Sequence, residues 1–155
     1  MGSTLMAQEC RRLGLRPTIT PEAEVFWEEA RRNRLVVDRC EECGHCYFPP
    51  RGWCWRCERA DSIDQRHDAG RVATLYSYTV NEMAWFPGLA VPYVVGLAEF
   101  DGIDGVRVPC RVRSREIGWL RIGARLEVGF ETGEDNLAIP SFIVQAPAEE
   151  ADVAG

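Results

Sequence analysis

Lysine is missing from this sequence of 155 residues, and all 18 basic residues are arginine. The chain therefore holds no lysine that could form a Schiff base, grip a phosphate or act as a general base. No apolar run approaches the roughly 20 residues of a membrane-spanning helix, and the first residues lack the apolar stretch of a secretory signal. We therefore expect a cytoplasmic protein without membrane partners, built as one compact domain or as a small module attached to another.

Catalytic patterns are also missing. The sequence has only two histidines, and it shows no G-x-S-x-G motif, no phosphate-binding loop and no convincing catalytic triad. Cys110 has no histidine near it in the sequence, so we interpret it as a buried apolar cysteine on a strand. We predict no catalytic residue and expect the chain not to be catalytic alone.

Positive charge is scarce in the second half. Residues 1–71 carry 12 arginines and 12 acidic residues, whereas residues 72–155 carry 6 arginines and 12 acidic residues, which supplies the whole net charge of −6. A nucleic-acid surface normally has the opposite sign.

Cysteine, by contrast, is concentrated: five of the seven cysteines fall within residues 40–57. In a reducing compartment such a cluster favours a metal site over disulfides. Cys40 and Cys43 form one C-x-x-C knuckle and Cys54 and Cys57 form another, with ten residues between the two knuckles. Gly44 permits the tight turn after the first knuckle. Because zinc prefers four ligands in a tetrahedron and four thiolates close its coordination shell, we predict a structural Zn²⁺ in a zinc ribbon.

Two alternatives stay open at this point. The sequence Cys43-Gly-His-Cys46 is also C-x-x-C, so Cys46 or His45 could replace one of the ligands. Iron is the other metal that four thiolates suit, as in a rubredoxin-like centre.

The remaining pattern predicts a mainly β protein. Thr20 and Pro21 suit the start of a helix over residues 21–34. Its Phe26 and Trp27 indicate packing on its own domain, with a partner-binding helix as the rival interpretation. A short strand precedes the cysteines and residues 61–70 read as a polar connection, before five strands expected at 71–82, 92–101, 106–113, 125–132 and 139–145.

These five strands, with a non-strand insertion at 116–123, match a small Greek-key barrel of the OB type. The predicted fold is therefore an N-terminal helix, a rubredoxin-like zinc ribbon and a five-stranded OB-fold barrel. The expected parts are an N-terminal segment and helix (1–34), the ribbon (35–66), the barrel (67–146) and a disordered tail (147–155).

Two apolar features exceed what solvent-exposed loops usually carry. Prolines stiffen the loop at residues 49–53, from which Arg51 and Trp53 project. The loop at residues 83–89, which contains Trp85 and Phe86, joins the first two barrel strands. An apolar loop suits a protein or acyl-chain partner better than a phosphate backbone, and a loop folded onto the barrel end is the alternative.

The order of these parts resembles the zinc-ribbon/OB-fold acyl-CoA-associated family. The resemblance covers about residues 22–145. It is carried by the helix with Phe26-Trp27, the C-x-x-C-G, P-P-R and C-x-x-C motifs, and the strand that begins at Gly70-Arg71-Val72.

The resemblance implies a partner role in lipid metabolism. Family members bind thiolase-like enzymes that act on acyl-CoA, including thiolases, acyltransferases and retro-aldolases that shorten steroid side chains. It implies that Cys40, Cys43, Cys54 and Cys57 bind zinc, that two copies sit on a dimeric thiolase-like partner, and that acyl-CoA binds at or near the interface. We therefore predict an accessory subunit of an acyl-CoA lyase, aldolase or acyltransferase complex, with partner or acyl-CoA contacts at Arg51, Trp53, Trp85 and Phe86.

Two other functions serve as alternatives. Zinc ribbons and OB folds widely bind nucleic acid, and aromatic residues such as Tyr76 and Tyr78 could stack on bases, although the acidic barrel half argues against this. The third hypothesis is a small iron electron carrier, which would be coloured.

Overall fold

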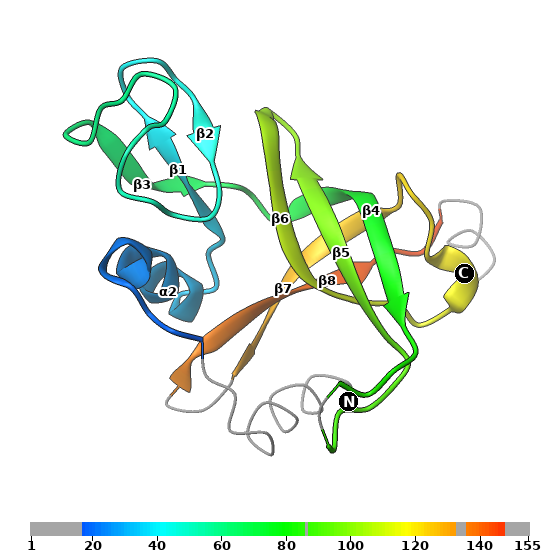
Figure 1. The fold of residues 1–155 in the computed structure, drawn as a ribbon. Helices are drawn as coiled ribbons and strands as arrows, with labels where there is room; N and C mark the ends of the chain where they lie inside the picture. The colour runs from blue at the N-terminus through cyan, green and yellow to red at the C-terminus, as the bar shows by residue number, and fades with distance from the viewer. Residues whose placement is uncertain (1–16, 86, 133–135, 148–155) are drawn as a thin grey trace.

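The computed structural model describes residues 17–85, 87–132 and 136–147. Figure 1 shows a short helix, a small three-stranded sheet and a closed five-stranded barrel, which confirms the predicted fold. From residue 148 onward, the predicted disordered tail lies outside the described residues. No helix in the described part of the chain is long and apolar enough to cross a membrane.

The helix is shorter than the sequence suggested. A 3-10 turn, η1 (Pro21–Ala23), leads into α2 (Glu24–Arg31), and proline occupies the start of the turn as expected. The prediction that Thr20 caps it was only partly right, because Thr20 has extended backbone but its side chain makes no capping hydrogen bond. The helix ends before Arg34 because Asn33 adopts a left-handed conformation with φ 58°.

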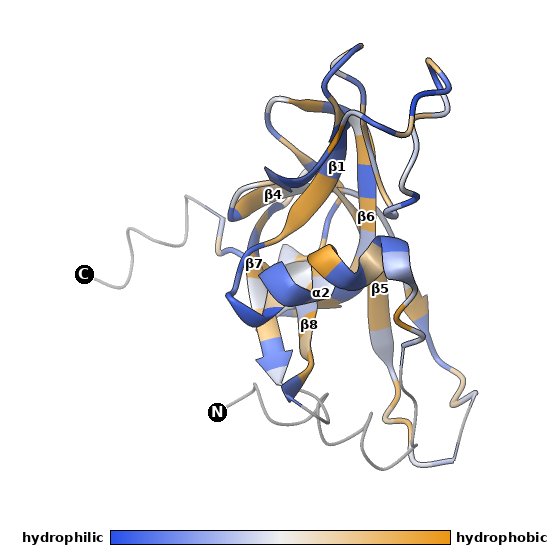
Figure 2. Ribbon diagram, turned by 90° about the vertical axis from the view of Figure 1, so that its left-hand side faces the viewer, coloured by the Kyte–Doolittle hydropathy of each residue, from blue (hydrophilic) through white to orange (hydrophobic). Residues whose placement is uncertain are grey.

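The helix packs on its own chain. Phe26 is buried and its ring meets that of Trp27 edge-on at 5.1 Å. Phe26 also contacts Phe48 of the cysteine region, at a centroid distance of 5.5 Å. Phe26 is therefore not exposed as the rival interpretation expected, whereas a partner-binding role for the helix stays a prediction. In Figure 2, the visible turns of α2 are mainly hydrophilic, while apolar stretches run along the strands behind it.

The small sheet has β1 (Val36–Cys40) at its centre, between β2 (Cys46–Tyr47) and β3 (Ile63–Asp68), all antiparallel. The interpretation of residues 61–70 as a polar connection was wrong for β3. Its sequence, IDQRHD, has no apolar face, but its backbone pairs with β1 from Val36↔Asp68 to Cys40↔Ile63. Backbone pairing thus makes a strand where the side-chain pattern gives no sign of one.

The barrel strands follow the alternating pattern closely. They run in the order β4-β5-β6-β8-β7, and the short turn η2 (Ile117–Trp119) lies in the expected insertion. Antiparallel pairs join all neighbours except β6 and β8, which are parallel. The five strands are β4 (Val72–Asn81), β5 (Tyr93–Phe100), β6 (Ile103–Arg113), β7 (Arg125–Thr132) and β8 (Ala138–Val144).

One glycine in the barrel wall is required by space. A Cβ on Gly96 of β5 would lie 2.6 Å from Val112 Cγ2 and 2.8 Å from Leu75 Cδ1. Both neighbours belong to the core, so any side chain at this position would collide with packed atoms. The narrow interior of the barrel therefore requires glycine at this position.

The described residues form one large and one small hydrophobic cluster. The large cluster takes side chains from all five barrel strands, together with Phe26 and residues 35–37. The small one lies in the three-stranded sheet and consists of Cys40, Tyr47 and Cys54, with Cys57 and Ile63 packed against it. The cysteine region thus has little apolar burial of its own.

Candidate metal centre

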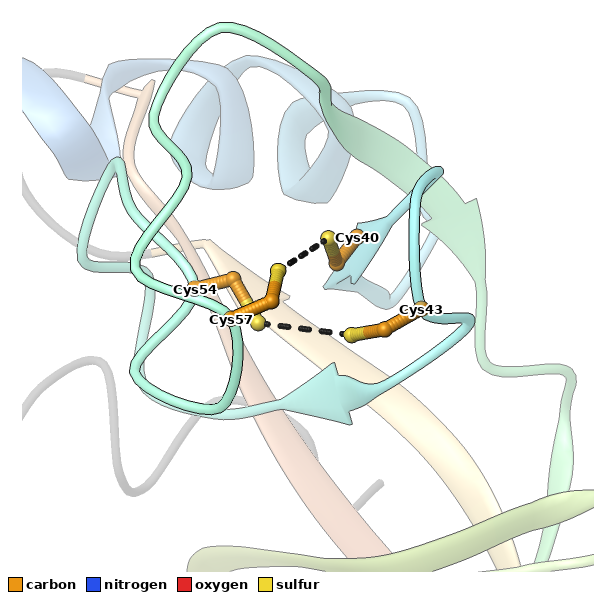
Figure 3. Close-up of side chains that lie close together, drawn as sticks. All are labelled: Cys40, Cys43, Cys54 and Cys57. Atoms are coloured by element: carbon orange, nitrogen blue, oxygen red, sulfur yellow. Dashed lines mark hydrogen bonds between the residues drawn. The ribbon is translucent and has the colours of Figure 1, made fainter.

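The four predicted cysteines meet at one end of the small sheet. Cys40 ends β1 and Cys43 lies in the turn that follows, whereas Cys54 and Cys57 come from the long connection between β2 and β3. Their Sγ atoms all lie within 4.8 Å of one another, with Cys40–Cys57 at 3.5 Å and Cys43–Cys54 at 3.6 Å (Figure 3). Four sulfurs bound at about 2.3 Å to one zinc ion lie about 3.8 Å apart. The spacing therefore fits a single tetrahedral ion.

The two knuckles have the same backbone hydrogen bonding. The Cys40 N–H donates to the carbonyl of His45 at 2.9 Å, and the Cys54 N–H donates to the carbonyl of Arg59 at 2.7 Å. In each case the first cysteine of the knuckle closes the loop onto the residue five positions later. Both sulfurs of a knuckle are thereby turned toward the same point.

Each knuckle also turns through a left-handed residue directly after its second cysteine. Gly44 has φ 69° and Glu58 has φ 57°. The predicted role of Gly44 in the tight turn agrees with this conformation, which glycine adopts without steric strain. No feature of the sequence indicates that Glu58 occupies the equivalent position.

The surroundings of the thiols favour different charge states. Burial opposes ionisation of Cys54, but backbone N–H groups of Cys57 and Arg56 outweigh it and lower the pKa of Cys54 to about 7. Burial and the neighbouring thiols of Cys40 and Cys54 raise the pKa of Cys57 to about 12. Because zinc binds thiolates, its binding must release protons and must weaken in acid.

The alternative ligands lie outside this cluster. Cys46 Sγ points to the carbonyl of Gly44 at 3.9 Å, and burial raises the pKa of Cys46. The His45 ring stacks on Tyr47 at 6.0 Å and meets Trp55 edge-on at 4.9 Å. Within the described ranges, the four knuckle cysteines are the one group of metal-binding side chains close enough to share an ion.

A buried carboxylate that the sequence did not reveal lies within the ribbon, on its central strand. Asp38 of β1 is 1% exposed, and its Oδ2 accepts the backbone N–H of Arg51 at 3.3 Å. The backbone N–H of Gly52 also hydrogen-bonds to this carboxylate, whereas the buried Tyr47 hydroxyl has no hydrogen-bond partner among the described residues. Burial nevertheless raises the pKa of Asp38 above its usual range. Asp38 thus connects β1 to the proline-rich loop at residues 49–53.

A second buried carboxylate joins the helix to the small sheet. Glu29 of α2 is fully buried and pairs with Arg32 at 2.7 Å, Arg34 at 3.0 Å and Arg66 at 3.3 Å. The helix predicted over residues 21–34 includes Arg32 and Arg34. The structure shows them beyond the end of α2, directed back toward Glu29.

The predicted contact residues fall into two separate regions. Arg51 is exposed and Trp53 is 45% exposed in the ribbon, whereas Trp85 is 65% exposed in the loop between β4 and β5. Phe86 lies outside the described residues. Figures 1 and 2 both place the ribbon and the β4–β5 loop toward opposite ends of the molecule. The structure therefore does not bring the two predicted features together.

The alternative of a loop folded onto the barrel end is not supported by the described part of this loop. Met83 and Trp85 are 62% and 65% exposed. Large apolar side chains held in solvent at a loop tip are typical of an interaction surface.

Comparison with known proteins gives two matching families. Residues 27–64 match "ChsH2, rubredoxin-like zinc ribbon domain", and residues 66–131 match "ChsH2, C-terminal OB-fold domain". Together with the clustered cysteines, the first match supports a structural Zn²⁺ as the cofactor.

Related sequences differ in length. A probable enoyl-CoA hydratase alpha subunit of Thermomonospora curvata is 29% identical over 93% of this chain, but the chain spans only 44% of that relative. A DUF35 domain-containing scaffold protein of Methanothermobacter thermautotrophicus is 29% identical over 72% of this chain and 85% of that relative.

Among solved structures, the Ltp2-ChsH2(DUF35) aldolase has a chain that matches with a TM-score of 0.72 and 27% identity. The match covers 83% of this chain and 98% of that one. The fold, the cysteine arrangement and the matches to both domains all indicate the same family. The chain belongs to the DUF35 family of zinc-ribbon and OB-fold proteins, to which the ChsH2 domains also belong.

Proposed function

We propose that this chain is a zinc-binding accessory subunit of a thiolase-like protein, in a complex that acts on acyl-CoA substrates. The reaction proposed for the complex is cleavage of a carbon–carbon bond, by retro-aldol chemistry or thiolysis, during degradation of steroid or lipid side chains. One observation carries the proposal: the match to a chain of the Ltp2-ChsH2(DUF35) aldolase extends over 98% of that chain.

The proposed role of the metal is structural. Cys40, Cys43, Cys54 and Cys57 supply four thiolates, which leave no open position for substrate or water. Bound zinc would supply no acid–base or redox chemistry here, and would hold the two knuckles together. The protein itself stabilises the ribbon in two further ways. Backbone N–H groups close each knuckle, and the Asp38 carboxylate accepts a hydrogen bond from the adjoining loop.

The proposed docking surface includes the β4–β5 loop. Its Trp85 stands in solvent, and Phe86 follows it in the sequence. Arg51 and Trp53 form a second contact on the ribbon, where an arginine could meet the phosphates of CoA in a bidentate pair. We propose two copies of the chain on a dimeric partner, because symmetric assemblies of this kind repeat one interface.

Reconstitution tests this proposal. The purified chain is mixed with a thiolase-like protein recovered with it from native extract, and cleavage of a β-hydroxyacyl-CoA is followed for the partner alone, the chain alone and the mixture. We expect a stable complex, no turnover by the chain alone and faster turnover by the mixture. Turnover by the chain alone would contradict an accessory role, and so would recovery of nucleic acid without any acyl-CoA enzyme.

A hydratase partner is the second candidate. The specific observation in its favour is the enoyl-CoA hydratase alpha subunit of Thermomonospora curvata, which matches 93% of this chain. The same recovery experiment separates the candidates, because a hydratase subunit would bring hydration of an enoyl-CoA instead of bond cleavage.

A further inference from the structure

The proline-rich loop of the ribbon is fastened at three places. At its start, the Phe48 ring packs against Phe26 of the helix. At its end, Cys54 is fully buried in the sulfur cluster. Between these points, Asp38 accepts the N–H of Arg51 at 3.3 Å. The loop is therefore positioned by the helix, the metal centre and one buried carboxylate.

The carboxylate holds the loop at the turn through Arg51 and Gly52. Asp38 receives the N–H groups of two successive residues, Arg51 and Gly52. Gly52 has φ 72°, and a Cβ there would lie 3.2 Å from Cγ of Glu22. The turn thus packs against both Asp38 and Glu22. Because Asp38 is only 1% exposed, water has little room to replace it as the acceptor.

The same turn carries two exposed side chains of complementary chemistry. Arg51 offers a permanent positive charge with planar donors, and Trp53, which is 45% exposed, offers apolar area. The hydrogen bond to Asp38 fixes the backbone of Arg51, and the adjacent cysteine ligand Cys54 fixes the backbone of Trp53. Such fixation lowers the ordering entropy that a flexible loop loses on binding.

We infer that Asp38 is a positioning residue, which holds Arg51 and Trp53 in the orientation that an anionic group beside an apolar pocket on the partner subunit would accept. The inference rests on the proposed function, because the thiolase-like subunit is the partner it assumes. Asp38 touches neither partner nor substrate and acts through the loop backbone. Tyr47, its neighbour across the β1–β2 pair, shares the small core with Cys40 and Cys54.

The first measurement concerns the isolated chain. In Asp38→Ala we expect amide exchange of Arg51 and Gly52 to become at least about tenfold faster, since their acceptor is lost. Bound zinc should remain at one ion per chain. Asp38→Asn keeps an acceptor oxygen of the same shape, so it should show a smaller effect and serves if the alanine variant folds poorly. Asp64→Asn is the matched control, because its carboxylate lies near Asp38 but accepts the N–H of Arg66 instead.

The second measurement uses the complex. Affinity for the thiolase-like subunit is compared in wild type, Asp38→Ala, Arg51→Ala and the double variant. We expect the weaker-binding single variant to lose at least about tenfold in affinity. If Asp38 acts through Arg51, the double variant should lose no more than that. Losses that multiply, or unchanged affinity in Asp38→Ala, would overturn the inference.

The two proposals can fail separately. If wild type binds no thiolase-like subunit, the proposed function fails, and amide exchange alone then decides on Asp38. Faster exchange at Arg51 and Gly52 would support the positioning role, whereas unchanged exchange would overturn it.

Discussion

In the barrel, side chains from all five strands fill a shared core, and Leu75, Leu126 and Phe142 have no exposed surface. In the ribbon, the local core contains Tyr47 and two of the four clustered cysteines. A core of that size buries too little apolar area to offset the loss of chain entropy. The barrel is thus built like an ordinary domain, while the ribbon depends on the metal and on the contacts of Leu35 and its neighbours with the large core.

Metal removal should give the largest difference between the two regions. Structural zinc contributes on the order of 10 kcal/mol in small zinc modules. We expect a strong chelator, or Cys54→Ser, to unfold the ribbon while the barrel strands stay protected. Hydrogen exchange followed by mass spectrometry, together with metal analysis, measures both regions at once. Simultaneous loss of protection in the barrel would show that the two regions fold as one unit.

Truncation of the barrel core should act in the opposite way. Phe142→Ala removes a fully buried ring and should lower the free energy of unfolding by about 3–5 kcal/mol. Urea denaturation measures this effect, and the zinc content of the folded fraction should not change. Ile143→Ala is the matched control on the same strand, since Ile143 is 39% exposed and should cost less than about 1 kcal/mol.

Gly96 gives a smaller test of the same core. Gly96→Ala places a methyl group where Val112 and Leu75 already lie within 2.8 Å. The strain should lower the free energy of unfolding by about 1–3 kcal/mol. Gly118→Ala is the control, because no atom lies within 4 Å of its added Cβ. Equal melting temperatures for the two variants would show that the barrel wall is less closely packed than the distances indicate.

The smallest effect on folding should come from the β4–β5 loop. Trp85 is 65% exposed, so Trp85→Ala should change the free energy of unfolding by no more than about 0.5 kcal/mol. Affinity for the partner subunit should fall at least about tenfold if Trp85 anchors the interface. Ile117→Ala is the control, because this residue is also exposed but belongs to η2. Isothermal titration calorimetry compares both variants, and equal affinities would exclude Trp85 as an anchor.

The sequence predicted those features that repeat or alternate. Barrel strand β7 was expected at residues 125–132, where the structure has it, because its apolar side chains alternate toward the core. The two C-x-x-C pairs likewise predicted a cluster of four sulfurs. Periodic patterns and fixed spacings are local, so they can be seen without knowing the fold.

The features that the sequence did not reveal depend on contacts between distant segments. Asp38 is the one acidic residue of strand β1, and its role appears only when the turn at Arg51 is folded onto it. Glu29 looks like an ordinary helix-surface glutamate until Arg66 of β3 approaches it. Strand β3 was missed for the same reason, since its evidence is the backbone of β1 and not its own side chains.

The two knuckles are alike in hydrogen bonding but differ in the residue that adopts the left-handed conformation. The first turns through Gly44, whereas the second forces a residue with a side chain, Glu58, into φ 57°. That conformation costs an L-residue about 1 kcal/mol more than glycine. The halves of the metal clamp are therefore unequal, and the half around Cys57 has the stronger tendency to open. As zinc is withdrawn, the knuckles should be released in a fixed order, with the second before the first.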